Sequence, residues 1–90
     1  DAVLALAFPL HPPGKPEKSR APELLAPVEA GLPVHVIQGE TDAFGAPAEV
    51  KQALGRGRAR LVSAVPGPHG FAPTAGPAVV RAAARFLETL

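Results

Sequence analysis

The sequence contains no cysteine, methionine, tryptophan or tyrosine, and its 90 residues include only four phenylalanines. Without cysteine, the chain has no disulfide, no thiolate nucleophile and no site for a soft metal. Its three histidines do not have the spacing of a zinc site, so neither a metal nor a cofactor is expected. Because aromatic side chains are so scarce, alanine and short aliphatic residues must fill the core, which favours thin helices packed on a sheet.

An excess of charge of either sign is also absent, since nine basic residues nearly balance eight acidic ones. The net charge of +1 predicts no nucleic-acid partner and no binding to an anionic membrane. The basic cluster Arg56, Arg58 and Arg60 is interpreted as a solvated loop before a strand, with a phosphate site as the alternative. No apolar run reaches the ~18–20 residues of a membrane span and no signal peptide is visible, so a cytoplasmic location is expected.

What the sequence does contain is an alternation of apolar segments and helical segments. Strands are predicted at 2–10, 32–38 and 60–65, short helical turns at 22–30, and helices at 46–54 and 75–90. The run AVLALAFPL is apolar throughout, so the first strand is expected to be buried on both faces, with Pro9 at its end. This order of elements predicts an α/β fold, with a three-stranded parallel sheet and flanking helices.

The last helix has the clearest pattern. Arg81, Arg85 and Glu88 are expected on its outer face. Its apolar residues recur at helical spacing and are all expected to pack in the core: Val79, Val80, Ala83, Phe86, Leu87 and Leu90.

The predicted sheet is too small to be complete. A chain of this length buries only about 60–65% of its unfolded surface, and three parallel strands leave two exposed edges. Either further strands exist elsewhere in the full protein, or the chain associates with itself through these edges. Because the chain begins with Asp1 before an apolar strand and contains no methionine, residues 1–90 are expected to be one partial domain from a truncated, proteolysed or domain-only chain.

Two residues with the potential for acid–base chemistry follow predicted strands. Asp42 lies four residues beyond Gln38, and His69 lies four residues beyond Val65. Since ligands gather at the carboxyl ends of parallel strands, the two loops are expected side by side. A carboxylate there accepts a hydrogen bond from one imidazole nitrogen and orients the other nitrogen for proton transfer. Taken separately, the two residues are better explained as a turn former and a solvated histidine; their joint placement favours an acid–base pair.

The motifs around these residues, QGETDAFG and PGPHGF, resemble the α/β-hydrolase fold, in which nucleophile, acid and histidine follow in that order. The stretch FPLHPPGKPEKSR is similar to a dienelactone-hydrolase-like family that includes bacterial predicted hydrolases, a testis-expressed protein and a subunit of the NSL chromatin complex. The resemblance covers residues 3–90 but only the last third to half of a typical member. It implies that Asp42 is the acid and His69 the base of a catalytic triad.

The resemblance also implies that part of the active site lies outside these residues. The G-x-S-x-G nucleophile elbow and the oxyanion-hole loop belong upstream of Asp1, and neither Ser19 nor Ser63 is proposed as a nucleophile. The chain is therefore expected to be the C-terminal part of a serine hydrolase that acts on small ester or acyl substrates. This part is expected to be inactive by itself. The alternative is a non-catalytic interaction module that retains the scaffold.

Four further residues are of interest. His11, Phe44 and Phe71 are candidates to line a substrate pocket. The alternative for His11 is to anchor the proline-rich loop, and the alternative for the two phenylalanines is to pack under the loops. His35 lies within the second predicted strand and is expected to be a packed or hydrogen-bonded residue of the sheet.

Overall fold

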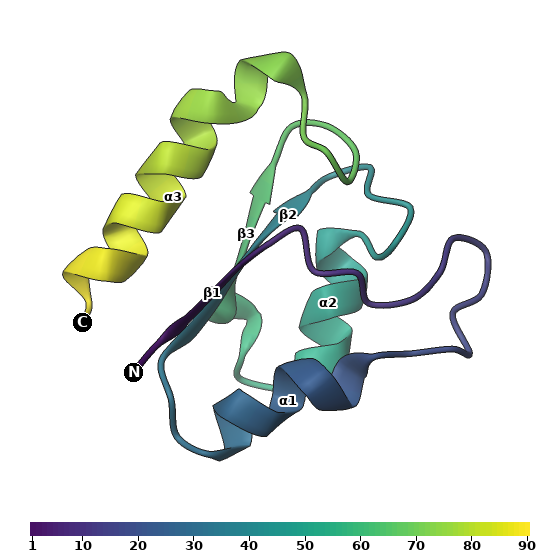
Figure 1. Ribbon diagram of the computed structural model, residues 1–90, viewed down its shortest axis with the longest axis horizontal. Coiled ribbons are helices and arrows are strands. Elements are labelled where there is room, and N and C mark those ends of the chain that lie inside the picture. Colours follow the sequence, from purple (N-terminus) through teal and green to yellow (C-terminus); the bar gives the residue numbers. More distant parts are fainter.

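Three short apolar segments form a parallel sheet with helices on both faces, as Figure 1 shows for a computed structural model that describes residues 1–90. The strands are β1 (Val3–Leu6), β2 (Val34–Gly39) and β3 (Val62–Val65), in the order β1-β2-β3. The helices are α1 (Ala21–Glu29), α2 (Pro47–Leu54) and α3 (Gly76–Glu88), with short 3-10 turns η1 (Ala59–Leu61) and η2 (Pro73–Ala75). The predicted α/β class and parallel sheet are confirmed. None of the helices is long and apolar enough to span a bilayer.

β1 is shorter and less buried than the predicted strand. It ends at Leu6, because the chain turns at Ala7, which has a positive φ of 62°. β1 pairs only with β2, and the Leu6 side chain is 55% exposed, so the expected burial on both faces was wrong. The rest of the apolar run is accounted for by Phe8 and Leu10, which leave the strand and pack on the core from the following loop.

The first core lies between the sheet and the pair α1 and α2. Proline stands in the first turn of both helices, where its missing N–H group breaks no hydrogen bond. α2 begins where the Glu49 carboxylate accepts the Ala46 N–H group at 2.7 Å, and it ends before Gly55, whose φ is +98°. The buried residues of this core are Leu10, Leu24, Val34, Val36, Val50, Leu54 and Val62.

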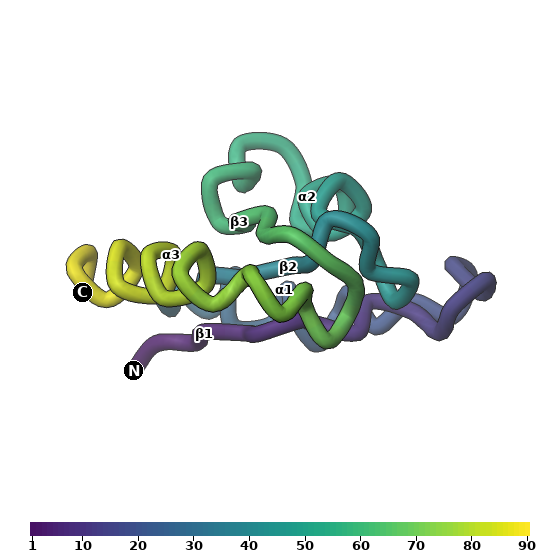
Figure 2. The backbone as a smooth tube through the Cα atoms, turned by 90° about the horizontal axis from the view of Figure 1, so that it is seen from above, coloured from purple at the N-terminus to yellow at the C-terminus, as the bar shows by residue number.

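The second core lies on the opposite face, where α3 packs on β2 and β3 (Figure 2). Its buried residues are Ile37, Val65, Ala75 and Ala82, and Phe86 is also buried on the inner face of α3. The prediction that the whole apolar stripe of this helix is core was wrong in part. Val80, Leu87 and Leu90 are 67%, 59% and 61% exposed. Val80 and Leu87 lie about one residue around the helix from the packed positions, and a sheet of three strands is too narrow to cover that flank. Leu90 lies beyond the end of α3 at Glu88.

Candidate functional site

The loops that follow β2 and β3 are joined through their backbones. The Glu40 N–H group donates to the Val65 carbonyl at 2.9 Å, and the Thr41 N–H group donates to the Gly67 carbonyl at 3.1 Å. Gly39 permits this contact: a Cβ atom at its position would lie 2.4 Å from the Gly67 oxygen and 2.3 Å from the Pro68 oxygen. A side chain at this position would separate the two loops.

Asp42 lies in the first of these loops with its side chain fully buried. One carboxylate oxygen, Oδ1, accepts the Phe44 N–H group at 2.8 Å, which closes a local turn typical of aspartate. The other oxygen, Oδ2, lies 2.8 Å from Nδ1 of His69 and 3.4 Å from Nε2 of Gln38. Both oxygens are therefore held by hydrogen-bond donors, so the orientation of the carboxylate is fixed.

Gln38 supports this arrangement through the hydrogen bonds of its side chain. Its side chain is wholly buried at the end of β2. Its Oε1 atom accepts the Phe8 N–H group at 2.9 Å, and its Nε2 atom donates to the carbonyls of Phe8 at 2.9 Å and Gly45 at 2.7 Å. Gln38 thus ties the loop after β1 to the loop that holds Asp42. Sequence reasoning missed this role, although a buried amide side chain near the end of a mainly apolar strand is a signal for it.

His69 lies in the loop after β3, with its imidazole against the ring of Phe44 at a centroid distance of 4.4 Å. Because a carboxylate can only accept a hydrogen bond, the short Nδ1–Asp42 contact places a proton on Nδ1. The second ring nitrogen, Nε2, has no hydrogen-bond partner in the chain, and the side chain is 37% exposed. The structure therefore brings the two predicted acid–base residues together and leaves Nε2 of the imidazole without a partner in the chain.

The backbone of this loop is tightly turned. Gly67 has a φ of +105°, and Phe71, a bulky residue, has a φ of 62°. The N–H groups of Phe71 and Ala72 donate back to the Pro68 and Pro66 carbonyls at 2.8 and 3.0 Å. A positive φ is costly for an aromatic residue, so these contacts hold the loop, and His69 within it, in a conformation it would not adopt alone.

His11 anchors the proline-rich loop to α2. Its ring is buried, with Nδ1 2.9 Å from the Pro12 carbonyl and Nε2 3.0 Å from the Glu49 carboxylate. Both partners accept hydrogen bonds, so the ring donates to both of them in its doubly protonated form. The hydrogen bonds to Pro12 and then to Glu49 raise the pKa of His11, and those from Ala46 and then His11 lower the pKa of Glu49. Of the two expectations for His11, this geometry favours anchoring.

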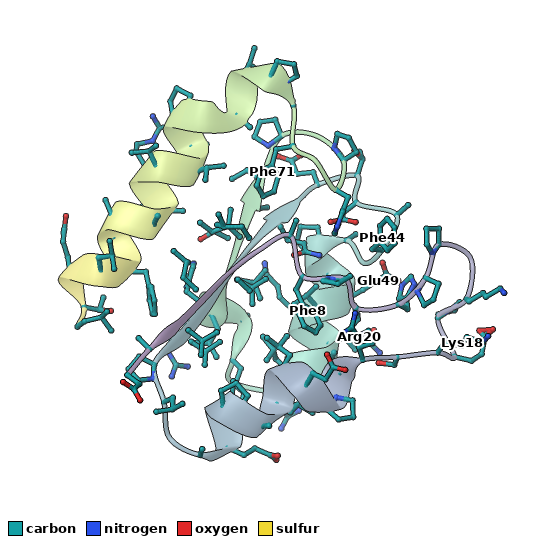
Figure 3. The ribbon with its side chains drawn as sticks, in the orientation of Figure 1. Phe8, Lys18, Arg20, Phe44, Glu49 and Phe71 are labelled. Atoms are coloured by element: carbon teal, nitrogen blue, oxygen red, sulfur yellow. The ribbon has the colours of Figure 1, made fainter.

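The two phenylalanines have different surroundings (Figure 3). Phe44 lies against His69 and lines a small cavity of about 130 Å³. His11 lines the same cavity, so these two predicted pocket residues do meet. Phe71 instead packs against the second core, beside α3.

The remaining histidine and the two serines lie elsewhere. His35, on β2, places Nε2 2.7 Å from the Ser63 hydroxyl on β3 and stacks on Phe86. It is the hydrogen-bonded sheet residue that was expected. The Ser19 hydroxyl accepts the N–H group of Ala21. Neither serine contacts His69, and no group of three histidine or acidic side chains is arranged to hold a metal ion.

Comparison with known proteins gives one family. A family model described as an alpha/beta hydrolase domain matches residues 1–82, which is most of the chain. No curated protein and no solved structure matches the chain.

Proposed function

Since the chain belongs to the α/β-hydrolase domain family, we propose that it forms the C-terminal part of a serine hydrolase of the dienelactone-hydrolase-like type. The substrate is a small ester or other acyl compound. Asp42 and His69 are the acid and base of the active site. The serine nucleophile and the oxyanion-hole donors belong to a part of the protein outside these 90 residues, so the chain by itself is inactive.

In this proposal His69 moves protons at its free Nε2 atom. Nε2 takes the proton of the serine hydroxyl as the serine oxygen attacks the acyl carbon. It then returns that proton to the leaving alcohol, which leaves an acyl-serine. Water attacks the acyl-serine by the same route and releases the carboxylic acid. Asp42 holds the imidazole in the required tautomer and stabilises its positive charge during each transfer.

The contact between Nδ1 of His69 and Oδ2 of Asp42 carries this proposal. At 2.8 Å it joins a fully buried carboxylate to an imidazole that is 37% exposed and whose other nitrogen has no hydrogen-bond partner in the chain. A purely structural Asp–His pair has no need of an unpaired nitrogen on a partly exposed ring. The backbone hydrogen bonds between the two loops also fix the acid–base geometry before a substrate arrives.

The test is the esterase activity of the full-length protein on short acyl esters of p-nitrophenol. His69→Ala is expected to lower kcat by at least about 1000-fold, because it removes the base. Asp42→Asn is expected to lower kcat by a similar factor, since an amide favours the wrong tautomer. His35→Gln is the matched control, because His35 also bonds a side-chain oxygen but lies at the other end of the sheet. Full activity in His69→Ala, or equal loss in His35→Gln, would refute the assignment.

One observation favours a second function, that of a non-catalytic interaction module. No serine of these 90 residues contacts His69, so the pair has no nucleophile within the chain. The sequence upstream distinguishes the two functions. A Gly-x-Ser-x-Gly between a strand and a helix supports the hydrolase. Its absence, together with no esterase activity in the full-length protein, supports the interaction module.

A further inference from the structure

The larger cavity of the molecule lies far from Asp42 and His69. It has a volume of about 440 Å³ and opens where the amino ends of β2 and β3 meet the last turns of α3. This volume is in the range of small-molecule sites. Its walls are mainly apolar, and its polar lining consists of His35, Arg60, Ser63, Arg85 and Thr89.

The charge in this cavity is of one sign. Arg60 and Arg85 both line it, and no acidic side chain does. Arg60 donates to the Gly57 carbonyl, and neither guanidinium takes part in an ion pair. An arginine keeps its charge at any physiological pH and presents several donors in one plane. The cavity therefore offers two positive groups whose ionic partner is not part of the chain.

The neutral polar groups suit an anion as well. His35 is uncharged at neutral pH, because burial and then the nearby positive charge of Arg85 lower its pKa. In the tautomer that carries a proton on Nε2, His35 donates to the Ser63 oxygen, and the hydroxyl proton of Ser63 is then free for a ligand. Thr89 donates from Oγ1 and from its N–H group to the Phe86 carbonyl, so one of the exposed carbonyls at the end of α3 is already occupied.

The apolar walls limit what kind of anion fits. Phe86 presents its aromatic ring, and the rest of the apolar lining consists of Pro33, Val34, Leu61 and Ala82. No glycine-rich turn supplies a set of backbone N–H groups for a phosphate. We propose that this cavity binds a monocarboxylic acid with an aromatic or short aliphatic body, its carboxylate at Arg60 and Arg85 and its body against Phe86. This is a second binding site, separate from the proposed hydrolase site.

The test uses 4-phenylbutyrate as the probe and 4-phenylbutanol as its uncharged counterpart. Isothermal titration is expected to show saturable binding of the acid, at least about tenfold tighter than the alcohol, because a charge-assisted hydrogen bond adds this much. Backbone NMR signals of Ser63 and Thr89 are expected to shift, whereas those of Asp42 and His69 stay in place. This pattern locates the ligand at the amino end of the sheet.

Arg85→Gln is the principal variant, because the residue is exposed and its loss leaves the core intact. It is expected to weaken binding of the acid at least about tenfold and to leave the alcohol unaffected. Arg81→Gln is the matched control: it removes the same charge from an exposed position of α3 that does not line the cavity. Ser63→Ala, which keeps both charges, is expected to weaken binding about three- to tenfold.

Three results would overturn the proposal. If the acid and the alcohol bind equally, the cavity recognises only an apolar body. If Arg81→Gln weakens binding as much as Arg85→Gln does, the attraction is the general charge of the helix. If the acid does not saturate the protein at millimolar concentration, the cavity is not a carboxylate site. Binding that is unchanged in His69→Ala separates this site from the proposed catalytic one.

Discussion

Each end of the β-sheet carries a histidine hydrogen-bonded to a side-chain oxygen, but the two ends differ in what surrounds the ring. At the carboxyl end, Nδ1 of His69 lies 2.8 Å from a buried carboxylate, and the loops around it touch backbone to backbone. At the amino end, Nε2 of His35 lies 2.7 Å from a hydroxyl, beside a cavity of about 440 Å³ with two arginines. One imidazole is held by a closely packed scaffold, and the other borders open space.

The comparison shows that a hydrogen-bonded histidine does not by itself define a site. The partner of the ring decides its chemistry. A carboxylate fixes the tautomer of His69, whereas the hydroxyl of Ser63 suits both tautomers of His35: it accepts from a protonated Nε2 and donates to an unprotonated one. The packing around the ring decides how much the geometry tolerates change. Substitutions at the two ends should therefore differ in cost, and four measurements test that difference.

The largest effect is expected at Gly39. In Gly39→Ala the new Cβ atom meets two carbonyl oxygens at 2.3 and 2.4 Å, so the loops must move apart. The free energy of unfolding, from urea titrations, should fall by about 3 kcal/mol or more. Gly70→Ala is the control, since a Cβ atom there meets nothing within 4 Å, and its cost should stay within about 0.5 kcal/mol. Equal costs for the two variants would mean that the loop contact is not tight.

The next effect is expected at Gln38. Gln38→Ala leaves the backbone groups of Phe8 and the Gly45 carbonyl without their buried partner. The free energy of unfolding should fall by about 2–4 kcal/mol, since each buried polar group left unpaired costs about 1–3 kcal/mol. Gln52→Ala makes the same change at an exposed position of α2 and should cost little. If Gln38→Ala is equally mild, water must replace the amide, and the carboxyl end is more open than the structure shows.

A smaller effect is expected at Phe86, at the amino end. Phe86→Leu removes the stacking on His35, whose centroid distance is 5.6 Å. Because one side of Phe86 faces a cavity, the change should cost only about 1–2 kcal/mol in urea unfolding. Leu87→Ala, on the exposed flank of α3, should cost less than about 0.5 kcal/mol. A cost for Phe86→Leu as large as that of Gln38→Ala would remove the contrast between the two ends.

The smallest effect is a pH dependence of opposite sign for two histidines. The pKa of His35 is lowered from 6.5, so the unfolded chain takes up its proton first and stability falls as the pH drops below 6.5. The pKa of His11 is raised from 6.5, so its contribution is fully present below 6.5 and is lost as the pH rises through the raised value. The free energy of unfolding is measured by urea titration between about pH 5 and pH 8. His35→Gln should remove the loss of stability at low pH, and His11→Gln should remove the extra stability that the protonated His11 contributes at low pH. The same slope in both variants would contradict these shifts.

Much of this molecule could be predicted from its residues, and the misses have physical causes. Periodicity and proline placement located the three strands and the helices α2 and α3, because each signal is local to the element that it marks. The prediction was wrong at 22–30, where α1 is a full helix and not a pair of short turns, and at Arg60 and Leu61, which form the 3-10 turn η1 before β3 begins. The exposure of Leu6 and Leu87 could not be predicted, since it depends on how many neighbours the sheet provides. Asp42 and His69 were found because parallel strands bring their loops to one edge. Gln38 and the cavity of Arg60 and Arg85 were missed because each joins segments far apart in the chain.

The joining of the two loops has a consequence for engineering. The spacing between Asp42 and His69 depends on N–H groups that meet carbonyls at Glu40–Val65 and Thr41–Gly67, and every amino acid except proline supplies those groups. Randomised libraries at Glu40 and Thr41 should therefore yield many variants that keep Asp42 and His69 within hydrogen-bonding distance, whereas libraries at Gly39 should yield almost none. The loop sequence next to the pair is thus open to change without redesign of the pair itself.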